Sequence, residues 1–416
     1  GLWVTKQLRD LGSVAFLNRC DDLKTIQTEG GMIRIGAMVT IADLRRFIAD
    51  KHPSFAEMLR RYGSEQVRNA ATIGGNIAEN SGGVHCLKYG LTVHNVMELT
   101  FLSSDTEIIT IGSHHFEQAG YDLLALLNGS EGMLGIVLEA KLRLLTIPPQ
   151  KQVLMAAFTR IEDAGNAVAD IIAKGVIPAG LEMMDQAVIQ ATENFCQPGY
   201  PIDAAAILLC ELDGHSEALH SDLKKVEQAC LANAATSTQL AESEAEQALL
   251  WKGRKAAFPA IGQLAPDYLC MDGTIPRKHL AKVLGAISQF SKDHGLAVAN
   301  VFHAGDGNLH PLIMYDANRE GDLEKAEAIG AKILELCVAV GGTITGEHGV
   351  GIEKLNQMCV QFNQHELEQF MAIKAAFDET SLLNPGKAIP TLQRCAEFGA
   401  MHVHAGELPF KDLPRF

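Results

Sequence analysis

Two histidines in one short glycine-rich segment give the strongest chemical signal in this sequence. The segment reads His303-Ala-Gly-Asp-Gly-Asn-Leu-His310. On one straight strand, residues seven apart point to opposite faces, but Asp306-Gly307 is a favoured pair for a type I′ turn. A two-residue hairpin centred on that pair places His303 opposite His310, where Cβ atoms on one face are about 5 Å apart. We therefore expect both imidazoles to reach a single cation.

A carboxylate next to a further imidazole completes the pattern, in Gly346-Glu347-His348-Gly349. Two histidines and one carboxylate that leave coordination positions open are typical of a catalytic site for zinc or a similar divalent metal. The same dipeptide also offers a separate proton acceptor. The alternative is a polar turn beside a buried, hydrogen-bonded histidine, and the spacing alone leaves both open.

Arg254 is the third candidate, in Trp251-Lys-Gly-Arg254. An arginine among apolar neighbours can bind a substrate carboxylate with two N–H groups. A solvated position on a helix is the alternative.

Several motifs are absent. The sequence has no G-x-G-x-x-G, Walker A, H-E-x-x-H or G-x-S-x-G motif, so a Rossmann NAD site and the common hydrolase classes lack support. Its nine cysteines include no C-x-x-C pair, which argues against a disulfide framework, a zinc ribbon and an iron–sulfur cluster. We expect buried free thiols in a reducing cytoplasm.

The overall composition narrows the partners. The net charge of −15 disfavours nucleic acid, because phosphate contacts require clustered Lys and Arg. The longest apolar run, residues 204–210, is too short to cross a bilayer and reads as a buried strand, so we expect no transmembrane segment.

The elements that must position these residues alternate between strands and helices. Strands at 32–35, 108–111 and 136–145 accompany a helix at 41–50, and Pro148-Pro149 then marks a boundary. Beyond it we expect helices at 161–174, 185–195, 216–232, 242–258 and 322–340, a strand at 204–210 and a strand hairpin within 293–314. This predicts an α+β fold with domains at 1–150 and 151–383 and a tail at 384–416.

Six segments carry a resemblance to a known family: 78–83 (Ala-Glu-Asn-Ser-Gly-Gly), 86–92, 129–136, 303–310, 346–349 and 384–387 (Asn-Pro-Gly-Lys). From about residue 79 to 416 the chain resembles the FAD-linked subunits of bacterial glycolate oxidases. More broadly it is similar to D-lactate and D-2-hydroxyglutarate dehydrogenases of the vanillyl-alcohol-oxidase flavoprotein family.

The resemblance implies a fold and a cofactor. The fold would be a PCMH-type FAD-binding domain, N-terminally truncated, followed by a ferredoxin-like α+β substrate domain, with the tail returning to the FAD domain. FAD would be held by the loops at 72–83 and 129–136, whose glycine amides suit a pyrophosphate. The residues implied in FAD binding are Thr72, Ile73, Gly74, Gly75, Asn76, Ala78, Asn80, Gly82, Gly83, Gly129, Glu131, Gly132, Gly135, Ile136 and Asn384.

The resemblance also implies a reaction. A divalent metal on His303, His310 and Glu347 would polarise the α-hydroxyl of a 2-hydroxy acid, His348 would take its proton, and a hydride would pass to flavin N5. Arg254 would bind the carboxylate. Relatives that act on dicarboxylates use a lysine where Cys270 or Met271 stands here, which favours a monocarboxylate such as glycolate or D-lactate. Separate iron–sulfur and second flavin-type subunits are the implied partners, in the cytoplasm and at the inner membrane.

Residues 1–77 depart from this pattern. They include 1–8 and 67–77 (Val-Arg-Asn-Ala-Ala-Thr-Ile-Gly-Gly-Asn-Ile) and resemble the FAD domain of a bacterial xanthine dehydrogenase small subunit. The sequence therefore reads as a junction, near residues 74–80, of two related flavin-binding halves.

Three other functions compete with hydroxy-acid oxidation. An electron-relay FAD subunit of a molybdenum hydroxylase would not need the histidine and carboxylate cluster. A non-catalytic fragment would hold no flavin, and a metal-dependent hydrolase would work without it. A yellow protein that glycolate or D-lactate bleaches would exclude the fragment, and a colourless protein with metal-dependent activity would support the hydrolase.

Overall fold

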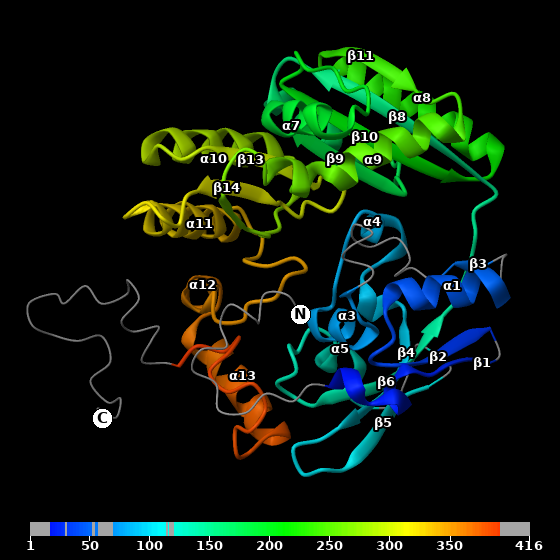
Figure 1. Ribbon diagram of the computed structural model, residues 1–416, viewed down its shortest axis with the longest axis vertical. Helices are drawn as coiled ribbons and strands as arrows, with labels where there is room; N and C mark the ends of the chain where they lie inside the picture. Colours follow the sequence, from blue (N-terminus) through cyan, green and yellow to red (C-terminus); the bar gives the residue numbers. More distant parts are fainter. Residues whose placement is uncertain are drawn as a thin grey trace, which may run out of the picture.

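Two antiparallel sheets with helices packed on them make up the molecule. The computed structural model describes residues 17–29, 31–51, 55–56, 70–113, 115 and 120–391. In Figure 1 the seven-stranded sheet forms the upper part and the five-stranded sheet the lower part, and α4 (Cys86–Tyr89) projects between them. The predicted α+β class is confirmed.

The five-stranded sheet carries the segments expected to bind FAD. Its order is β1-β2-β6-β4-β5, from strands Ile26–Glu29, Met32–Gly36, Ile136–Arg143, Val96–Leu102 and Ile108–Gly112. Buried side chains of alternate strand positions, such as Ile33 and Ile35, form one core with the helices. Those helices are α1 (Ile41–Lys51), α3 (Ile73–Glu79) and α5 (Leu123–Leu127). The short elements are η2 (Leu17–Arg19), η3 (Asp21–Lys24), η5 (Thr92–His94) and the strand pair β3 (Phe55–Ala56) and β7 (Leu145–Thr146).

The seven-stranded sheet has the order β11-β8-β10-β9-β13-β14-β12. In chain order its strands are β8 (Gln150–Phe158), β9 (Gly180–Asp185), β10 (Ala206–Gly214), β11 (Ala235–Leu240), β12 (Asp267–Cys270), β13 (Val298–His303) and β14 (Pro311–Tyr315). With α6 after β8 and α8 after β10, the first four strands have the β11-β8-β10-β9 arrangement of a ferredoxin-like unit. The ferredoxin-like prediction is therefore confirmed.

Helices cover both faces of this sheet. One face packs against α6 (Ile161–Ala173), α8 (Ser216–Ala232), α10 (Leu280–His294) and α11 (Asp322–Ala339). The other packs against α7 (Gln186–Cys196) and α9 (Glu244–Ile261). Residues at alternate positions of β13 face different cores: Phe302 joins the first, and Ala299 and Val301 join the second. By the same alternation His303 lies on the α9 face.

The chain then returns to the five-stranded sheet. After the loop that follows α11, α12 (Leu355–Gln361) and α13 (Gln364–Phe377) run beside the lower part of the molecule (Figure 1). Lys374 Nζ of α13 donates to Met133 O at 2.7 Å, and Ser104 Oγ donates to Phe377 O at 2.7 Å. The predicted tail at 384–416 is described only to Thr391.

Most predicted elements are present within a few residues, but α10 was not predicted. Its buried residues Leu280, Val283, Leu284 and Ile287 have the helical i, i+3, i+4, i+7 spacing. Because α10 extends to His294, the hairpin begins at Val298 and not at residue 293. The edge strand β12 was also missed.

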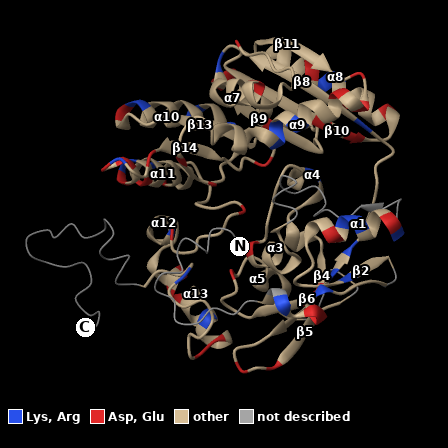
Figure 2. Ribbon diagram, viewed as in Figure 1, with Lys and Arg blue, Asp and Glu red and all other residues tan. Residues whose placement is uncertain are grey.

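Charged side chains lie on the outer helices, and most of the described cysteines are buried. Acidic and basic side chains are interspersed on the outer helices α8 and α11 (Figure 2). Seven of the described cysteines are free thiols and five of these are buried, whereas Cys359 is disulfide-bonded and departs from the expectation of free thiols. None of the described helices is long and apolar enough to cross a membrane.

Candidate active site

The histidine segment adopts a different register from the predicted hairpin. Asn300 pairs with Pro311, and His303 forms an isolated bridge with Asn308. The connection is therefore the four residues 304–307, in which Gly307 has a φ of +81°. The predicted pairing of His303 with His310 is wrong by two residues.

The two imidazoles nevertheless meet, because the error is an even number of residues. Side chains alternate between faces with a period of two, so a shift of two keeps His310 on the face of His303, whereas a shift of one would separate them. The two are then diagonal neighbours, which is still within reach of ring side chains. Their ring centroids are 5.1 Å apart, with the ring planes at 80°.

Glu347 closes a group of three possible metal ligands. Its Oε1 lies 3.3 Å from His303 Nε2 and 3.1 Å from His310 Nε2. One ligand atom from each of the three residues lies within 4.8 Å of the others, and no other such group is found among the described residues. The structure thus brings together the three predicted ligands.

Glu182 of β9 orients His303, and sequence reasoning missed it. This fully buried carboxylate accepts from His303 Nδ1 at 2.7 Å and from Arg254 Nε at 2.8 Å. A carboxylate on Nδ1 fixes the ring so that Nε2 faces the ligand group. The available signal was one acidic residue within the otherwise apolar run 181–184 of a strand.

Burial and neighbouring charges shift the pKa values of the two histidines in opposite directions. Burial lowers the pKa of His303, but the Glu182 and Glu347 carboxylates on either side outweigh it and raise that pKa to about 10. Burial lowers the pKa of His310 to about 4. Burial raises the pKa of Glu347, but its hydrogen bonds to the two histidines hold it well below its usual range. The site therefore pairs one cationic and one neutral imidazole around a carboxylate.

His310 supplies the test of whether a metal fits. Both of its ring nitrogens are buried: Nε2 lies 3.1 Å from Glu347 Oε1, while Nδ1 has no hydrogen-bond partner among the described residues. Burying such a poorly satisfied ring costs free energy unless a ligand binds it. A neutral imidazole nitrogen is also the form that binds a divalent ion. The three residues fit a divalent metal on both counts.

His348 stacks on this group and is fixed through its backbone. Its ring lies parallel to that of His310, with centroids 5.1 Å apart and planes at 3°. The buried carboxylate of Asp272 accepts from the backbone N–H groups of Gly346, Glu347 and His348 at 3.1, 2.9 and 2.7 Å. Asp272, which sequence reasoning also missed, therefore anchors the loop that carries the third ligand and the predicted base.

Lys354 balances the charge of Asp272. It bonds to the carboxylate of Asp272 and donates to Gly349 O at 3.0 Å. Burial raises the pKa of Asp272, but the charges of Lys354 and His348 outweigh it and lower that pKa well below its usual range. The anchor is a buried ion pair.

The segment at 78–83 reaches the same site from the five-stranded sheet. A Cβ added at Gly82 would lie 3.1 Å from Glu347 Oε2. A side chain there would press on the predicted ligand Glu347, which would have to shift by a few tenths of an ångström. The segment expected to bind flavin thus lies next to the predicted ligand group.

In the segment at 72–83, the amides of residues 73–76 are hydrogen-bonded within the protein. The N–H groups of Ile73, Gly74 and Asn76 donate to Val39 O, Ala37 O and Thr72 O, and that of Gly75 donates to Thr72 Oγ1. Glycine is required at 74 because a Cβ would lie 2.9 Å from that of Ala37. The tight packing of α3 on the strand explains these glycines.

Most amides of the second loop are also bound within the protein. Gly129 N donates to Ile77 O, and Glu131 N donates to Ala78 O, both at 2.8 Å. Asn384 Nδ2 donates to Glu131 O at 2.5 Å. Asn80 N donates to Ile77 O, and a Cβ added at Gly132 would lie 3.0 Å from Asn384 Nδ2. Gly135 packs on Phe101 of β4, and Ile136 begins β6.

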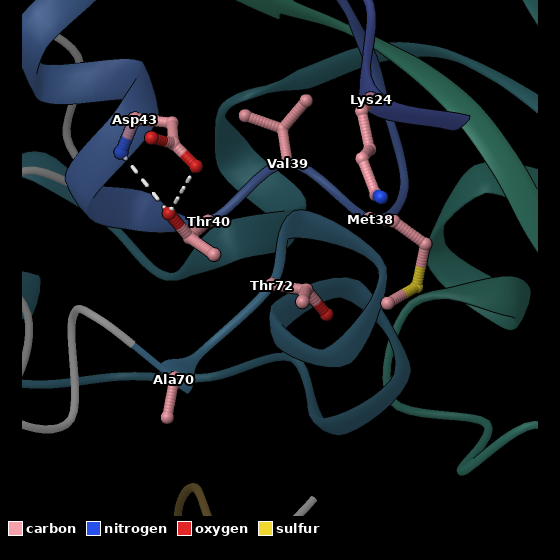
Figure 3. Close-up of a pocket in the computed structure, with 7 residues that line it drawn as sticks. All are labelled: Lys24, Met38, Val39, Thr40, Asp43, Ala70 and Thr72. Atoms are coloured by element: carbon pink, nitrogen blue, oxygen red, sulfur yellow. Dashed lines mark hydrogen bonds between the residues drawn. The ribbon is translucent and has the colours of Figure 1, made fainter. Parts of the chain in front are cut away.

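Side-chain atoms around α3 support a polar cofactor instead. Asn76 Nδ2, Glu79 Oε2 and Asn128 Oδ1 are buried and have no hydrogen-bond partner. A cavity of about 480 Å³ opens at the first turns of α1 and α3, lined by Lys24, Met38, Val39, Thr40, Asp43, Ala70 and Thr72 (Figure 3). The three unsatisfied atoms fit a bound polar group, whereas the cavity is lined by other residues and is a separate candidate site.

Comparisons with known proteins agree with both halves of this description. Residues 147–388 match the family described as FAD linked oxidases, C-terminal domain. Residues 1–115 match the FAD binding domain in molybdopterin dehydrogenase. The predicted resemblance to two flavoprotein families is therefore confirmed, and the second match extends to residue 115, beyond the predicted junction near residues 74–80.

Curated relatives are similar over most of the chain. Glycolate oxidase subunit GlcD of Escherichia coli strain K12 is 59% identical over 347 residues, which are 83% of this chain and 70% of that protein. GlcD of Bacillus subtilis strain 168 is 40% identical, over 76% of this chain and 68% of that protein. The mitochondrial cytochrome-type D-lactate dehydrogenase of Arabidopsis thaliana is 30% identical, over 77% of this chain and 57% of that protein.

Solved structures share the fold at low identity. The 4-ethylphenol oxidase of Gulosibacter chungangensis has a TM-score of 0.71 at 15% identity and covers 91% of this chain and 80% of its own. A p-cresol methylhydroxylase has a TM-score of 0.70 at 14% identity, over 89% and 78%. These likenesses confirm the PCMH-type flavoprotein fold, and together with the sequence matches they show that the chain belongs to the family of FAD-linked oxidases.

Proposed function

We propose that the chain oxidises a small 2-hydroxy acid, glycolate or D-lactate, to the 2-oxo acid with FAD as the oxidant. The observation that carries this proposal is the meeting of His303, His310 and Glu347 with His348, next to Gly82 of the flavin-side segment. The names of the relatives, glycolate oxidase subunit and D-lactate dehydrogenase, give the substrate class. An electron-relay subunit has no use for this group.

FAD, when bound beside the segments at 72–83 and 129–136, supplies the acceptor for the hydride of the α-carbon. A divalent ion such as zinc, when bound to the three ligands, favours the ionised form of the α-hydroxyl. The chain's own residues do the remaining work. His348 takes the hydroxyl proton on an imidazole nitrogen, and Asp272 fixes the loop that carries it.

Arg254 remains our candidate for binding the substrate carboxylate. Its Nε and Nη2 contact Glu182 Oε2, at 2.8 and 2.6 Å, which holds the guanidinium beside His303. Nη1 lies outside this contact. The arginine therefore has a structural role in orienting Glu182 as well as the proposed role in binding.

A monocarboxylate fits the charges near the site better than a dicarboxylate. Cys270 and Met271 are buried, and a Cβ added at Gly330 of α11 would touch Met271 Sδ at 2.9 Å. The nearby buried cation Lys354 is already paired with Asp272. We therefore propose that no lysine is free here for a second acid group.

We also propose partners and a location. The relative's name describes GlcD as a subunit, and the sequence has no C-x-x-C pair for its own cluster. A separate iron–sulfur subunit would accept the electrons, with a second flavin-type subunit, in the cytoplasm at the inner membrane. Co-purification with a subunit that shows an iron–sulfur absorption spectrum tests this.

Anaerobic spectroscopy tests the proposed activity. The purified protein should be yellow, and glycolate or D-lactate should bleach its visible absorbance. His348→Ala should keep its flavin and metal while the rate of bleaching falls by roughly 10²- to 10⁴-fold. His220→Ala, at an exposed position on α8, is the matched control. A colourless protein, or bleaching at the parent rate in His348→Ala, contradicts the proposal.

A further inference from the structure

Glu131 connects three segments that are far apart in the sequence. It lies in the loop at 129–136, with a left-handed φ of +52°. Its N–H donates to Ala78 O at 2.8 Å, and its carbonyl accepts from Asn384 Nδ2 at 2.5 Å. The backbone of Glu131 is thus fixed to the end of α3 and to the segment that follows α13.

The carboxylate of Glu131 binds the active-site loop. Its Oε1 accepts from Val350 N and its Oε2 from Gly351 N, both at 2.7 Å. These amides follow His348 by two and three residues. Hydrogen bonds from two successive amides to one carboxylate fix the position and the direction of the backbone.

The loop at 345–351 is therefore held from two sides. Asp272, at the end of β12 in the seven-stranded sheet, binds the amides of Gly346, Glu347 and His348. Glu131, in the loop that leads into β6 of the five-stranded sheet, binds the amides of Val350 and Gly351. Each part of the molecule supplies one carboxylate, fully buried in Asp272 and half-buried in Glu131.

Glu79 lies beside the contact between Glu131 and the active-site loop but makes none of its hydrogen bonds. A Cβ added at Gly349 would lie 2.3 Å from Glu79 Oε2 and 2.9 Å from Glu131 Cδ, so both carboxyl groups press on Gly349. Burial and the nearby Glu131 raise the pKa of Glu79 to about 7. Burial also raises the pKa of Glu131, and the two N–H donors from Val350 and Gly351 oppose that rise.

We propose that Glu131 is a positioning residue that ties the loop bearing Glu347 and His348 to the flavin-side segment. The metal ligand and the base are then placed relative to the flavin as well as to the seven-stranded sheet. This inference rests on the proposed function. It replaces the expectation that the Glu131 side chain binds the cofactor, since both of its oxygens are engaged by the loop.

We expect the loss of the Glu131 carboxylate to lower the rate of flavin reduction and to leave the affinity for the hydroxy acid unchanged. Hydride transfer needs the reacting atoms in close alignment, and a misplacement of about 1 Å can cost roughly 100-fold in rate. Glu131→Gln keeps the size of the side chain but turns an N–H group toward a backbone N–H. The loop should then move away from the flavin-side segment while its Asp272 anchor is unchanged.

The experiment compares Glu131→Gln with Glu107→Gln, a matched change at an exposed turn of the same sheet. Each variant is loaded with FAD and zinc and mixed anaerobically with glycolate or D-lactate in a stopped-flow instrument. In Glu131→Gln the limiting rate of flavin reduction per bound flavin should fall by roughly 10- to 100-fold. The acid concentration that gives half of that rate, the flavin content and the flavin spectrum should match the parent.

Hydrogen–deuterium exchange gives a readout that does not depend on activity. Peptides covering 345–352 should exchange faster in Glu131→Gln, and peptides from β8 should not change. An unchanged rate per flavin, unchanged exchange at 345–352, or loss of FAD with a parental rate in the flavin that remains would overturn the inference. If the parent is not reduced by any hydroxy acid, the proposed function fails, and the exchange result alone decides whether Glu131 holds the loop.

Discussion

Removing the charge of Asp272 is the sharpest test of how the active-site loop is built. In Asp272→Asn an NH₂ group replaces one oxygen, and it must face either Lys354 or the three loop amides. Either choice places a donor against donors and leaves the buried Lys354 cation unpaired. Breaking a buried ion pair on one side costs about 3–5 kcal/mol.

Two measurements follow this change. Urea unfolding should show that loss of stability, and Lys354→Met added to Asp272→Asn should recover part of it, because the unpaired cation is gone. Isothermal titration with Zn²⁺ should show a roughly 10- to 100-fold weaker affinity, since Glu347 loses the support of its backbone.

Asp378→Asn is the matched control. Asp378 is also buried, pairs with Lys374 and accepts from Leu382 N and Leu383 N, but it lies at the end of α13 and does not contact the loop. It should lose stability and keep the zinc affinity of the parent. Parental zinc affinity in Asp272→Asn, or an equal loss in both variants, would refute the reasoning.

Three further outcomes follow from the structure. Glu182→Gln should weaken Zn²⁺ binding by roughly 10- to 100-fold in titrations, because His303 loses the carboxylate that orients it. Gly349→Ala should lower the melting temperature more than Gly175→Ala: both have positive φ, +79° and +76°, but only Gly349 has side-chain atoms within 4 Å of the new Cβ. Burial raises the pKa of Asp185 to about 6, above its unfolded value, so stability should fall as pH rises from about 4 to 6, by up to roughly 3 kcal/mol in urea unfolding. Asp185→Asn should flatten that slope.

The meeting of the three candidate ligands could be predicted from the sequence because they lie in short, chemically unusual segments. His303 and His310 meet when their side chains point to the same face of the hairpin, and a register error of two residues keeps them on that face. Glu347 only has to lie in a nearby loop. The register itself could not be predicted. The end of β13 also pairs with β9 at residues 301–303, a long-range contact that the local sequence does not report.

The supporting carboxylates could not be predicted for a related reason. Glu182 lies 121 positions from His303, Asp272 lies 75 from Glu347, and Glu131 lies 219 from Val350. No periodicity in the sequence reports such contacts. The only sign of these carboxylates in the sequence is an acidic residue in an apolar strand or in a glycine-rich loop. That pattern also fits a surface position or a contact with a cofactor.

The charges of the assembled site connect the metal to the choice of substrate. Glu182 and Glu347 are negative, and Arg254 and the protonated His303 balance them when no ion is bound. A divalent ion on Nε2 requires His303 to be neutral, which leaves one net positive charge in a buried place. A single carboxylate neutralises that charge, whereas a second acid group would add an unpaired buried anion at considerable cost. With a divalent ion bound as proposed, the charge left over would favour a monocarboxylate independently of any contact that the substrate makes.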